Sequence, residues 1–259
     1  MPAPPLLRVS HLGKRFGAAI RACRDISFSV YPGEVLGIVG ESGSGKSTLL
    51  RCLAGELVPD AGTIELDIPA RGLTDIWRLD EAARRQRLRG MLGLVHQNPR
   101  DGLRLDISAG GNIAEPLMVN GGRRYATFRE TASAWLDKVE IPATRIDDLP
   151  ATFSGGMQQR LQIARNLVSQ PRLVLMDEPT GGLDVSVQAR LLDLLRGLVR
   201  ELGIAVIVVT HDLAVARMLS DRLLVMRRGK VAESGLADQV LDDPQSAYGQ
   251  LLVASVLRV

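Results

Sequence analysis

The stretch that decides the fold is Gly40-Glu41-Ser42-Gly43-Ser44-Gly45-Lys46-Ser47, which matches the phosphate-loop pattern G-x-x-x-x-G-K-[ST]. The apolar run before it, Val35 to Val39, is typical of a short buried strand, and the run from Ser47 to Leu53 is typical of the start of a helix. A chance match is expected in roughly one of a hundred such chains. The motif therefore predicts an α/β protein that binds a nucleotide.

Each residue type in this loop suits a phosphate group. Glycines allow the backbone N–H groups to curl around the β-phosphate, and the helix N-terminus adds its partial positive charge there. Lys46 is placed to reach the β- and γ-phosphates, and the Ser47 hydroxyl is placed to hold Mg²⁺. The residues predicted to bind the nucleotide here are Gly40, Glu41, Ser42, Gly43, Ser44, Gly45, Lys46, Ser47 and Thr48.

The composition is that of an ordinary globular domain, because 46% of the 259 residues are hydrophobic and 24% are charged. The net charge of +3 and the pI near 9.1 are mildly basic, but the cations are interleaved with acidic residues, which does not favour nucleic acid as a partner. No apolar run approaches the roughly 18 residues of a membrane span, so we expect no membrane insertion. The two cysteines, Cys23 and Cys52, lack metal-type spacing, which indicates a reducing, cytoplasmic location, and Cys52 is expected to be a packed thiol.

The remaining apolar patterns predict strands and helices in alternation. Strands are predicted at residues 6–12, 26–30, 35–39, 63–66, 91–95, 173–176, 205–209, 221–226 and 231–233, the last two as a hairpin around Arg228-Gly229. Helices are predicted at residues 47–53, 80–89, 127–139, 154–168 and 185–202, and again near the C-terminus. Turns are predicted at Pro99 to Gly102 and at Gly121-Gly122, and the first five residues are expected to be frayed.

Two pairs of polar residues follow predicted buried strands. Asp177-Glu178 ends one strand, and Thr210-His211 ends another. Catalytic groups in open α/β sheets collect at the carboxyl ends of the strands. A lone histidine is usually structural, but this position makes His211 a functional candidate.

Two further segments have an ordinary and a functional interpretation. Ser154-Gly155-Gly156 caps a helix, and the same opening presents free N–H groups to an anion. Phe16 precedes the phosphate loop, and spacing alone is equally compatible with a core position and with stacking on the base of a nucleotide. The buried stripe predicted for the helix after Ser154 is formed by Met157, Leu161, Ala164 and Val168.

The order of these segments resembles the ATP-binding-cassette (ABC) ATPases, and the likeness covers nearly the whole chain. The resemblance implies that Phe16 stacks on adenine, that Gln97 is the Q-loop residue, and that Ser154 to Gln158 is the signature motif. The catalytic residues that it implies are Glu178 as the base, His211 as the switch histidine, Lys46 and Gln97. The further nucleotide-binding residues are Phe16, Ser154, Gly155, Gly156, Gln158 and Asp184, and the ligands of Mg²⁺ are Ser47, Gln97 and Asp177.

The departures from the family pattern are mild. Phe153 stands where leucine is usual, Met157 intervenes before Gln158, and Phe16 stands where tyrosine is commoner. None of these substitutions removes a group that does chemistry.

The resemblance also implies the domain organisation and the cofactors. One ABC ATPase domain is expected over residues 1–259, with a RecA-like core and an antiparallel β part at residues 1–97 and 171–259 and a helical signature subdomain at residues 98–170. The expected cofactors are ATP and Mg²⁺. In this family two cassettes associate head to tail, so that the signature of one closes on the ATP of the other. We therefore expect a homodimer when ATP is bound.

The choice of partner rests on likenesses within the family. Asp177 to Thr180 with Leu183 to Ala189 resemble the ATPases of dipeptide and nickel importers. Residues 95–104, 108–113 and 140–150 instead resemble the ATP-binding subunits of the bacterial carbon–phosphorus lyase system, which breaks down phosphonates. This likeness is extended, so we expect a soluble lyase core complex as the partner, with a second ABC subunit as a further one.

Two alternatives remain open from the sequence. The chain could be the motor subunit of a dipeptide or phosphonate importer, or a nucleotide-gated assembly module whose binding matters more than its turnover. The segment after Gln97 bears on this choice, because in cassette ATPases it lies where the driven component docks. Here it is polar and glycine-rich, and Arg100, Asp101 and Arg104 are expected to be available for charged contacts.

Overall fold

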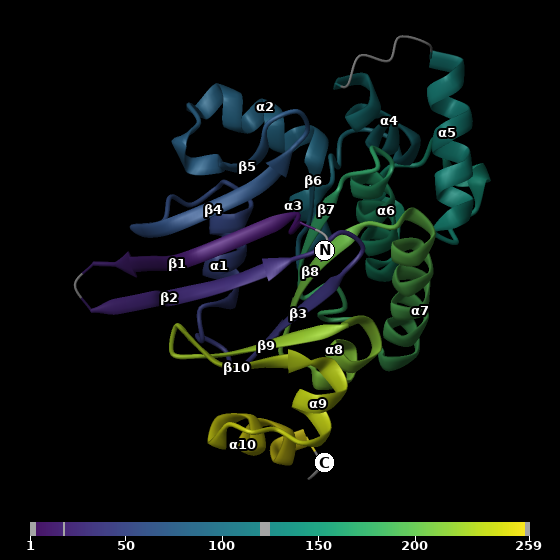
Figure 1. Cartoon of the computed structure of the whole chain (residues 1–259). Coiled ribbons are helices and arrows are strands. Elements are labelled where there is room, and N and C mark those ends of the chain that lie inside the picture. The colour runs from purple at the N-terminus through teal and green to yellow at the C-terminus, as the bar shows by residue number, and fades with distance from the viewer. Residues whose placement is uncertain (1–3, 18, 120–124, 257–259) are drawn as a thin grey trace.

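The computed structural model of the chain describes residues 4–17, 19–119 and 125–256, and it contains two β-sheets with helices between and around them (Figure 1). The larger sheet consists, in spatial order, of β10 (Lys230–Leu236), β9 (Arg222–Arg227), β3 (Val35–Val39), β8 (Ala205–Thr210), β7 (Leu173–Asp177) and β6 (Leu92–Val95). All neighbours pair in parallel except β10, which is antiparallel to β9. The predicted α/β class is confirmed, and so is the hairpin predicted around Arg228-Gly229.

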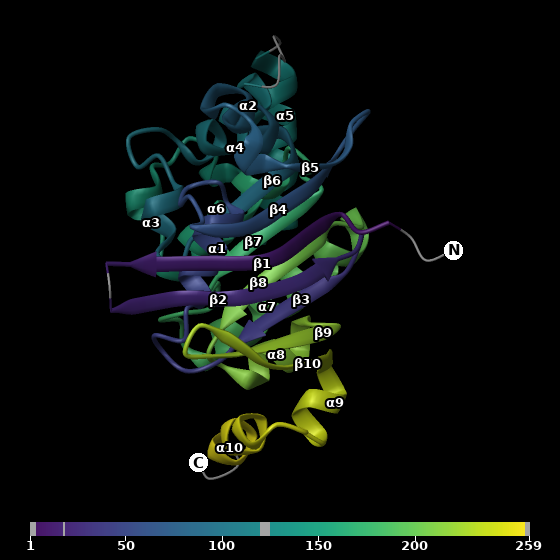
Figure 2. The same ribbon diagram turned by 60° about the vertical axis from the view of Figure 1, so that its left-hand side comes forward.

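The smaller sheet is antiparallel and contains the N-terminal strands. Its order is β2 (Ile20–Val30), β1 (Leu7–Phe16), β4 (Ala61–Ile68) and β5 (Gly72–Asp75). The predicted strands at 6–12 and 26–30 are confirmed but are longer than expected, and their outer ends form the arm that Figure 2 shows extending from the body of the protein. Strand β5 was not predicted, because its four residues have no apolar alternation.

Helix α1 (Lys46–Leu53) is packed between the two sheets. Its apolar side chains Leu49, Leu50 and Leu53 are buried in one cluster with residues of both sheets. Cys52 belongs to the same cluster, and burial raises the pKa of its thiol to about 11. The prediction that Cys52 is a packed thiol is therefore confirmed.

A second core lies on the other face of the large sheet. It is formed with α6 (Gly155–Leu167), α7 (Val185–Leu202), α4 (Ala109–Val119) and α5 (Tyr125–Lys138). Within the predicted stripe of α6, Leu161, Ala164 and Val168 are buried and Met157 is partly buried. Helix α7 has the predicted bounds and ends at Gly203, whose positive φ of 61° stops the helix.

The segment between β6 and β7 contains helices and no strand among its described residues. The turn expected at Pro99 to Gly102 is instead a single helical turn, α3 (Pro99–Gly102), because the Asn98 side chain accepts a hydrogen bond from the Arg100 N–H and caps it. The turn expected at Gly121-Gly122 lies outside the described residues. The division of the chain at residues 98 and 170 stays a prediction.

The remaining helices are α2 (Glu81–Met91), α8 (Leu213–Leu219), α9 (Ala237–Asp242) and α10 (Ala247–Val256). Helix α2 contacts β6 at one edge of the large sheet, α8 contacts the central strands β3 and β8, and α9 and α10 contact β10 at the other edge. Figures 1 and 2 show α9 and α10 below the β9–β10 hairpin, near the C-terminus. Within the described ranges, no helix is both long and apolar enough to cross a bilayer.

Substitution of a buried glycine tests the packing of the central strand. A Cβ at Gly37 of β3 would lie 2.3 Å from Ser220 Oγ and 2.5 Å from Leu223 Cδ2. We expect Gly37→Ala to lower the free energy of unfolding by about 1–3 kcal/mol, because the core must shift to accept the methyl group. Gly197→Ala is the matched control, since an added Cβ meets nothing within 4 Å there and the position is helical. In this control, the free energy of unfolding should rise by about 0.5–1 kcal/mol, because alanine favours a helix more than glycine does.

Urea denaturation of both variants measures the difference. Equal stabilities of the two variants would contradict the packing described for β3.

Candidate nucleotide site

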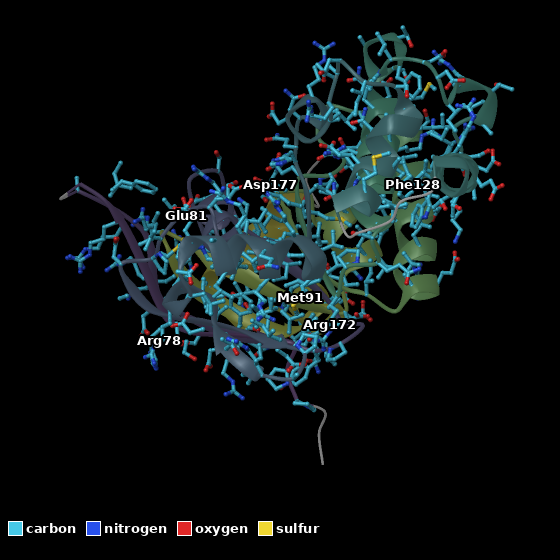
Figure 3. The ribbon with its side chains drawn as sticks, turned by 90° about the horizontal axis from the view of Figure 1, so that it is seen from above. Arg78, Glu81, Met91, Phe128, Arg172 and Asp177 are labelled. Carbon is cyan, nitrogen blue, oxygen red and sulfur yellow. The ribbon has the colours of Figure 1, made fainter. Side chains whose placement is uncertain are left out.

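The site lies where four parallel strands end. The sheet register places Val39 of β3 opposite Thr210 of β8, Val209 of β8 opposite Asp177 of β7, and Met176 of β7 opposite Val95 of β6. The phosphate loop, Asp177-Glu178, His211 and Gln97 therefore leave the sheet at one edge. In the view of Figure 3, Asp177 lies between the part of the chain that carries Glu81 and the helical part that carries Phe128.

Two glycines allow the phosphate loop to close against its neighbours. Gly40 has a φ of 149°, and a Cβ there would lie 2.1 Å from the Met226 carbonyl oxygen. Gly45 has a φ of 106°, and a Cβ there would lie 2.0 Å from the Ala22 carbonyl oxygen. Only glycine tolerates both the positive φ and the close backbone approach at these positions.

Lys46 is buried, with 7% of its surface exposed. Its Nζ donates hydrogen bonds to the carbonyl oxygens of Gly40 at 2.8 Å and of Glu41 at 3.0 Å. Burial lowers the pKa of this ammonium group, while the negative charges of Glu178, Asp177 and Glu41 act in the opposite direction. The lysine thus lies inside the loop, where it feels the charges of the two carboxylates at the end of β7.

Ser47 and Asp177 form a pair of oxygen donors beside the loop. The Ser47 hydroxyl donates a hydrogen bond of 3.3 Å to Asp177 Oδ1. Burial raises the pKa of Asp177, the Ser47 hydrogen bond lowers it, and the charge of Glu178 raises it further. Among the described residues, no group of three or more His, Cys, Asp or Glu side chains is placed to hold a metal ion. A hydroxyl and one carboxylate still suit Mg²⁺, because that ion is commonly held by one or two protein carboxylates together with the phosphates of its substrate.

The Glu178 carboxylate is held by side chains from two other strand ends. Gln97 Nε2 donates a hydrogen bond of 2.9 Å to Glu178 Oε2, and His211 Nδ1 lies 2.8 Å from Glu178 Oε1. The backbone of Glu178 has a φ of 43°, in the left-handed region that non-glycine residues rarely adopt. Strained residues of this kind cluster at active sites. The geometry therefore singles out Glu178 as the centre of the candidate site.

A cavity of about 1250 Å³ joins these groups. The predicted residues that line it are Phe16, Glu41, Ser42, Gly43, Gly45, Lys46, Ser47, Thr48, Gln97, Glu178 and His211. Phe16 is 42% exposed, which excludes the core position considered for it, whereas stacking on a base stays a prediction. The lining also includes Arg21, Arg24 and Arg228, which we did not predict, since the sequence does not show that β2 and the β9–β10 turn reach the phosphate loop.

Eight predicted residues lie outside the lining of this cavity. Gly40 and Ser44 belong to the phosphate loop itself, and Asp177 accepts the hydrogen bond of Ser47. The other five come from the starts of α6 and α7: Ser154, Gly155, Gly156, Gln158 and Asp184. Ser154 and Asp184 are exposed at the N-termini of α6 and α7, and the Asp184 side chain makes no capping hydrogen bond. Gln158 has a different place from the predicted one, because it is buried and its Nε2 donates to the carbonyl oxygens of Pro150 and Phe153. Gln158 therefore supports the turn before Ser154 and does not face a ligand.

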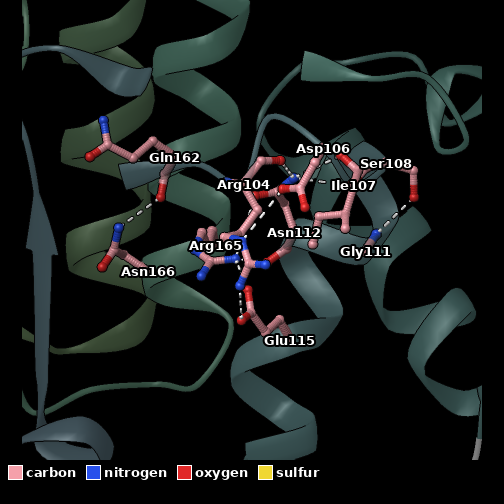
Figure 4. Close-up of polar contacts among 10 residues, drawn as sticks. All are labelled: Arg104, Asp106, Ile107, Ser108, Gly111, Asn112, Glu115, Gln162, Arg165 and Asn166. Atoms are coloured by element: carbon pink, nitrogen blue, oxygen red, sulfur yellow. Dashed lines mark hydrogen bonds and ion pairs between the residues drawn. The ribbon is translucent and has the colours of Figure 1, made fainter. Parts of the chain in front are cut away.

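The segment after Gln97 is held by a buried network (Figure 4). Asn112, which is fully buried, accepts a hydrogen bond from the Arg104 N–H and donates to the Arg104 carbonyl oxygen. The Arg104 guanidinium lies 3.3 Å from the carboxylate of Glu115 and 3.5 Å from that of Asp106. Arg104 is thus already paired within the chain, although its side chain is 54% exposed and Glu115 also pairs with Arg165 at 2.7 Å. Its availability for a partner stays a prediction. Arg100 and Asp101 are exposed, and the structure shows no ion pair for either among its described residues.

Comparison with known proteins identifies the family of the chain. A family model described as ABC transporter matches residues 23–181. The chain is 61% identical over 254 residues to PhnK of Escherichia coli, which carries the name of a phosphonates utilization ATP-binding protein, and the match covers 98% of both chains. It is 36% identical over 256 residues to the dipeptide transport ATP-binding protein DppD of Escherichia coli, covering 97% of this chain and 78% of that one.

Solved structures show the same fold. The structure of cbiO1 from Clostridium perfringens, part of the ABC transporter complex cbiONQ, gives a TM-score of 0.81 at 28% identity and covers 99% of this chain and 96% of that one. The ATP-binding cassette MJ0796, in a dimeric post-hydrolysis state bound to ADP and Pi, gives a TM-score of 0.79 at 30% identity and covers 89% and 98%. These findings confirm the expected resemblance, and the chain belongs to the ABC transporter family as an ATP-binding-cassette ATPase.

Proposed function

We propose that this ATPase drives a phosphonate carbon–phosphorus lyase system in the cytoplasm by coupling ATP-dependent dimer closure to remodelling of a soluble lyase core complex. The observation that carries the choice of system is the match to PhnK, which is 61% identical and extends over 98% of both chains. The matches to peptide-transport cassettes are 35–38% identical. An importer subunit is the second candidate.

The proposed chemistry is centred on Glu178. Its carboxylate is positioned to orient a water molecule and to accept the proton that the water loses when it attacks the γ-phosphate. Gln97 and His211 each contact a different oxygen of this carboxylate, so they fix its orientation. His211 is in addition a donor that can face the transferred phosphoryl group, since its side chain is 66% exposed in the site.

The phosphate loop and the metal ligands supply the charge stabilisation. Lys46 would exchange its bonds with the loop carbonyls for bonds with the β- and γ-phosphates. Ser47 and Asp177 would hold Mg²⁺, with the side-chain oxygen of Gln97 as a further ligand, because the Gln97 nitrogen is the atom bonded to Glu178. An ion held by these residues would supply positive charge against the negative charge that develops during phosphoryl transfer.

Two substitutions separate binding from hydrolysis. Glu178→Gln should leave the affinity for ATP within about two-fold and lower the single-turnover rate by about 10²–10⁴-fold, the contribution of a positioned general base. Lys46→Ala should weaken ATP binding by about ten-fold or more, because a charged hydrogen-bond donor is lost from a buried site. Equilibrium binding of ATP and single-turnover hydrolysis measure both effects. Hydrolysis by Glu178→Gln at the parental rate would refute the role of Glu178.

The exposed residues at the N-termini of α6 and α7 support a dimer that completes the site. Ser154 and Asp184 are exposed, and Val185 beside Asp184 is 84% exposed, which is unusual for a large apolar residue at a helix start. Gly156 packs close to Val187, so the N-termini of α6 and α7 form one surface. We propose that a second copy covers this surface and receives Ser154 at its own ATP. The dimeric state of MJ0796 supports this arrangement.

Dilution tests the dimer. The hydrolysis rate per chain should fall as the protein is diluted below its dimer affinity, and Ser154→Arg should abolish hydrolysis while ADP still binds. Ala134→Arg on the exposed face of α5 is the control, since it adds the same charge and bulk away from the proposed interface. A constant rate per chain across a wide dilution series would show that one copy suffices.

The partner contact is proposed at α3, directly after Gln97. Arg100 is exposed there without an ion pair among the described residues, whereas Arg104 is already paired with Asp106 and Glu115. Arg100→Glu should therefore reduce co-purification with the lyase core complex by several-fold, and added salt should weaken the parental contact. The isolated ATPase rate should not change.

The matched control is Arg71→Glu, an exposed arginine in the turn before β5 with the same change of charge. Equal recovery of the complex with both variants would remove Arg100 from the interface. Recovery of the protein only with membranes, from which detergent is needed to release it, would replace the lyase partner with an importer permease.

A further inference from the structure

The C-terminal helix α10 contacts the phosphate loop through Tyr248. The backbone N–H of Glu41, the second residue of the loop, donates a hydrogen bond of 3.1 Å to Tyr248 Oη. These two residues are separated by 207 positions in the chain. The contact is therefore tertiary, and it connects the end of the chain to the motif on which nucleotide binding depends.

The Glu41 backbone relays this contact to Lys46. Its N–H is bonded to Tyr248, and its carbonyl oxygen accepts hydrogen bonds from Lys46 Nζ at 3.0 Å and from the Ser44 N–H at 3.2 Å. One residue thus joins the Tyr248 hydroxyl to the ammonium group that faces the phosphates. A change in the Glu41 conformation would move the acceptor of Lys46 at the same time.

The position of Tyr248 is itself closely fixed. Its side chain is 7% exposed, it packs in one cluster with Val39, the last residue of β3, and the Arg227 guanidinium lies 4.6 Å from its ring centroid. A buried ring of this kind is expected to contribute to stability through packing alone. The Tyr248 hydroxyl makes a different contribution from the ring, because it accepts a hydrogen bond from the phosphate loop.

Glu233 of β10 fixes the start of α10. Its carboxylate accepts hydrogen bonds from the N–H of Gln245 at 2.7 Å and of Ser246 at 3.0 Å, and from the Ser246 hydroxyl at 2.6 Å. Burial raises the pKa of Glu233, but these hydrogen bonds together lower it below its usual value. The helix is therefore attached to β10 by a charged acceptor, and Tyr248 has little freedom to leave the loop.

We infer that Tyr248 is a positioning residue for ATP binding: its hydroxyl holds the Glu41 N–H, so that the loop is already ordered when the triphosphate arrives. The inference rests on the proposed role of the loop and of Lys46. Removing the hydroxyl leaves a partly buried N–H without its partner, and an ordinary hydrogen bond of this kind contributes about 1 kcal/mol. A loss of about 1 kcal/mol in binding free energy lowers the affinity for ATP by about five-fold.

The test is Tyr248→Phe in the full-length chain, which removes the hydroxyl and keeps the ring. The Kd and KM for ATP should rise by about five-fold with kcat within about two-fold, because an ordered loop contributes equally to binding substrate and transition state. Amide hydrogen exchange at Glu41 should become faster, and the melting temperature should change little. Tyr31→Phe is the control, since Tyr31 is exposed and the structure shows no hydrogen bond of its hydroxyl among the described residues.

A purely structural role of Tyr248 predicts a different result. Unchanged Kd, KM and Glu41 exchange in Tyr248→Phe would overturn the inference, as would a loss of kcat at unchanged KM. Failure of the parental protein to bind ATP, or normal binding by Lys46→Ala, would instead contradict the proposed function of the loop. The two failures are thus distinguishable.

Discussion

The site depends on the contacts of Gln97 and His211 with the two carboxylate oxygens of Glu178. These three side chains come from the ends of β6, β8 and β7, so the contact exists only if the strands are neighbours in register. The register in turn depends on the buried apolar strands and on the helices that cover both faces of the sheet. The strained φ of Glu178 is maintained by the same surroundings, including the hydrogen bond from its N–H to the Val209 carbonyl oxygen.

Helix α6 connects this site to the surface that carries Ser154. Strand β6 is at the edge of the large sheet, and side chains of α6 accept hydrogen bonds from backbone N–H groups along it. The N–H of Leu94 donates to Asn166 at 2.9 Å, and the N–H of His96, directly after β6, donates to Gln162 at 2.6 Å. Unpaired N–H groups at a sheet edge are costly when buried, so these bonds tie the helix firmly to the strand. A movement of Ser154 at the start of α6 would therefore also move Gln97, which lies directly beyond the end of β6.

Much of the fold and of the site could be predicted, because local patterns and motif spacing carry that information. The apolar runs located the strands of the large sheet, and the phosphate loop located Lys46 and Ser47. The sequence could not show the environment of Gln158, the pairing of Arg104 with Glu115 or the hydrogen bond of Tyr248 to Glu41. Each of these depends on contacts between segments that only the tertiary fold brings together, and no local pattern encodes them.

Cross-linking between defined positions tests most directly whether two copies complete each other's site. One copy would carry Ser154→Cys and the other Ser42→Cys, both with Glu178→Gln to retain ATP; the native Cys23 and Cys52 are buried and do not compete. On mild oxidation, a disulfide-linked heterodimer should form with Mg-ATP and not with Mg-ADP. Cross-linking that is absent with Mg-ATP, or equal with both nucleotides, would contradict the proposed dimer.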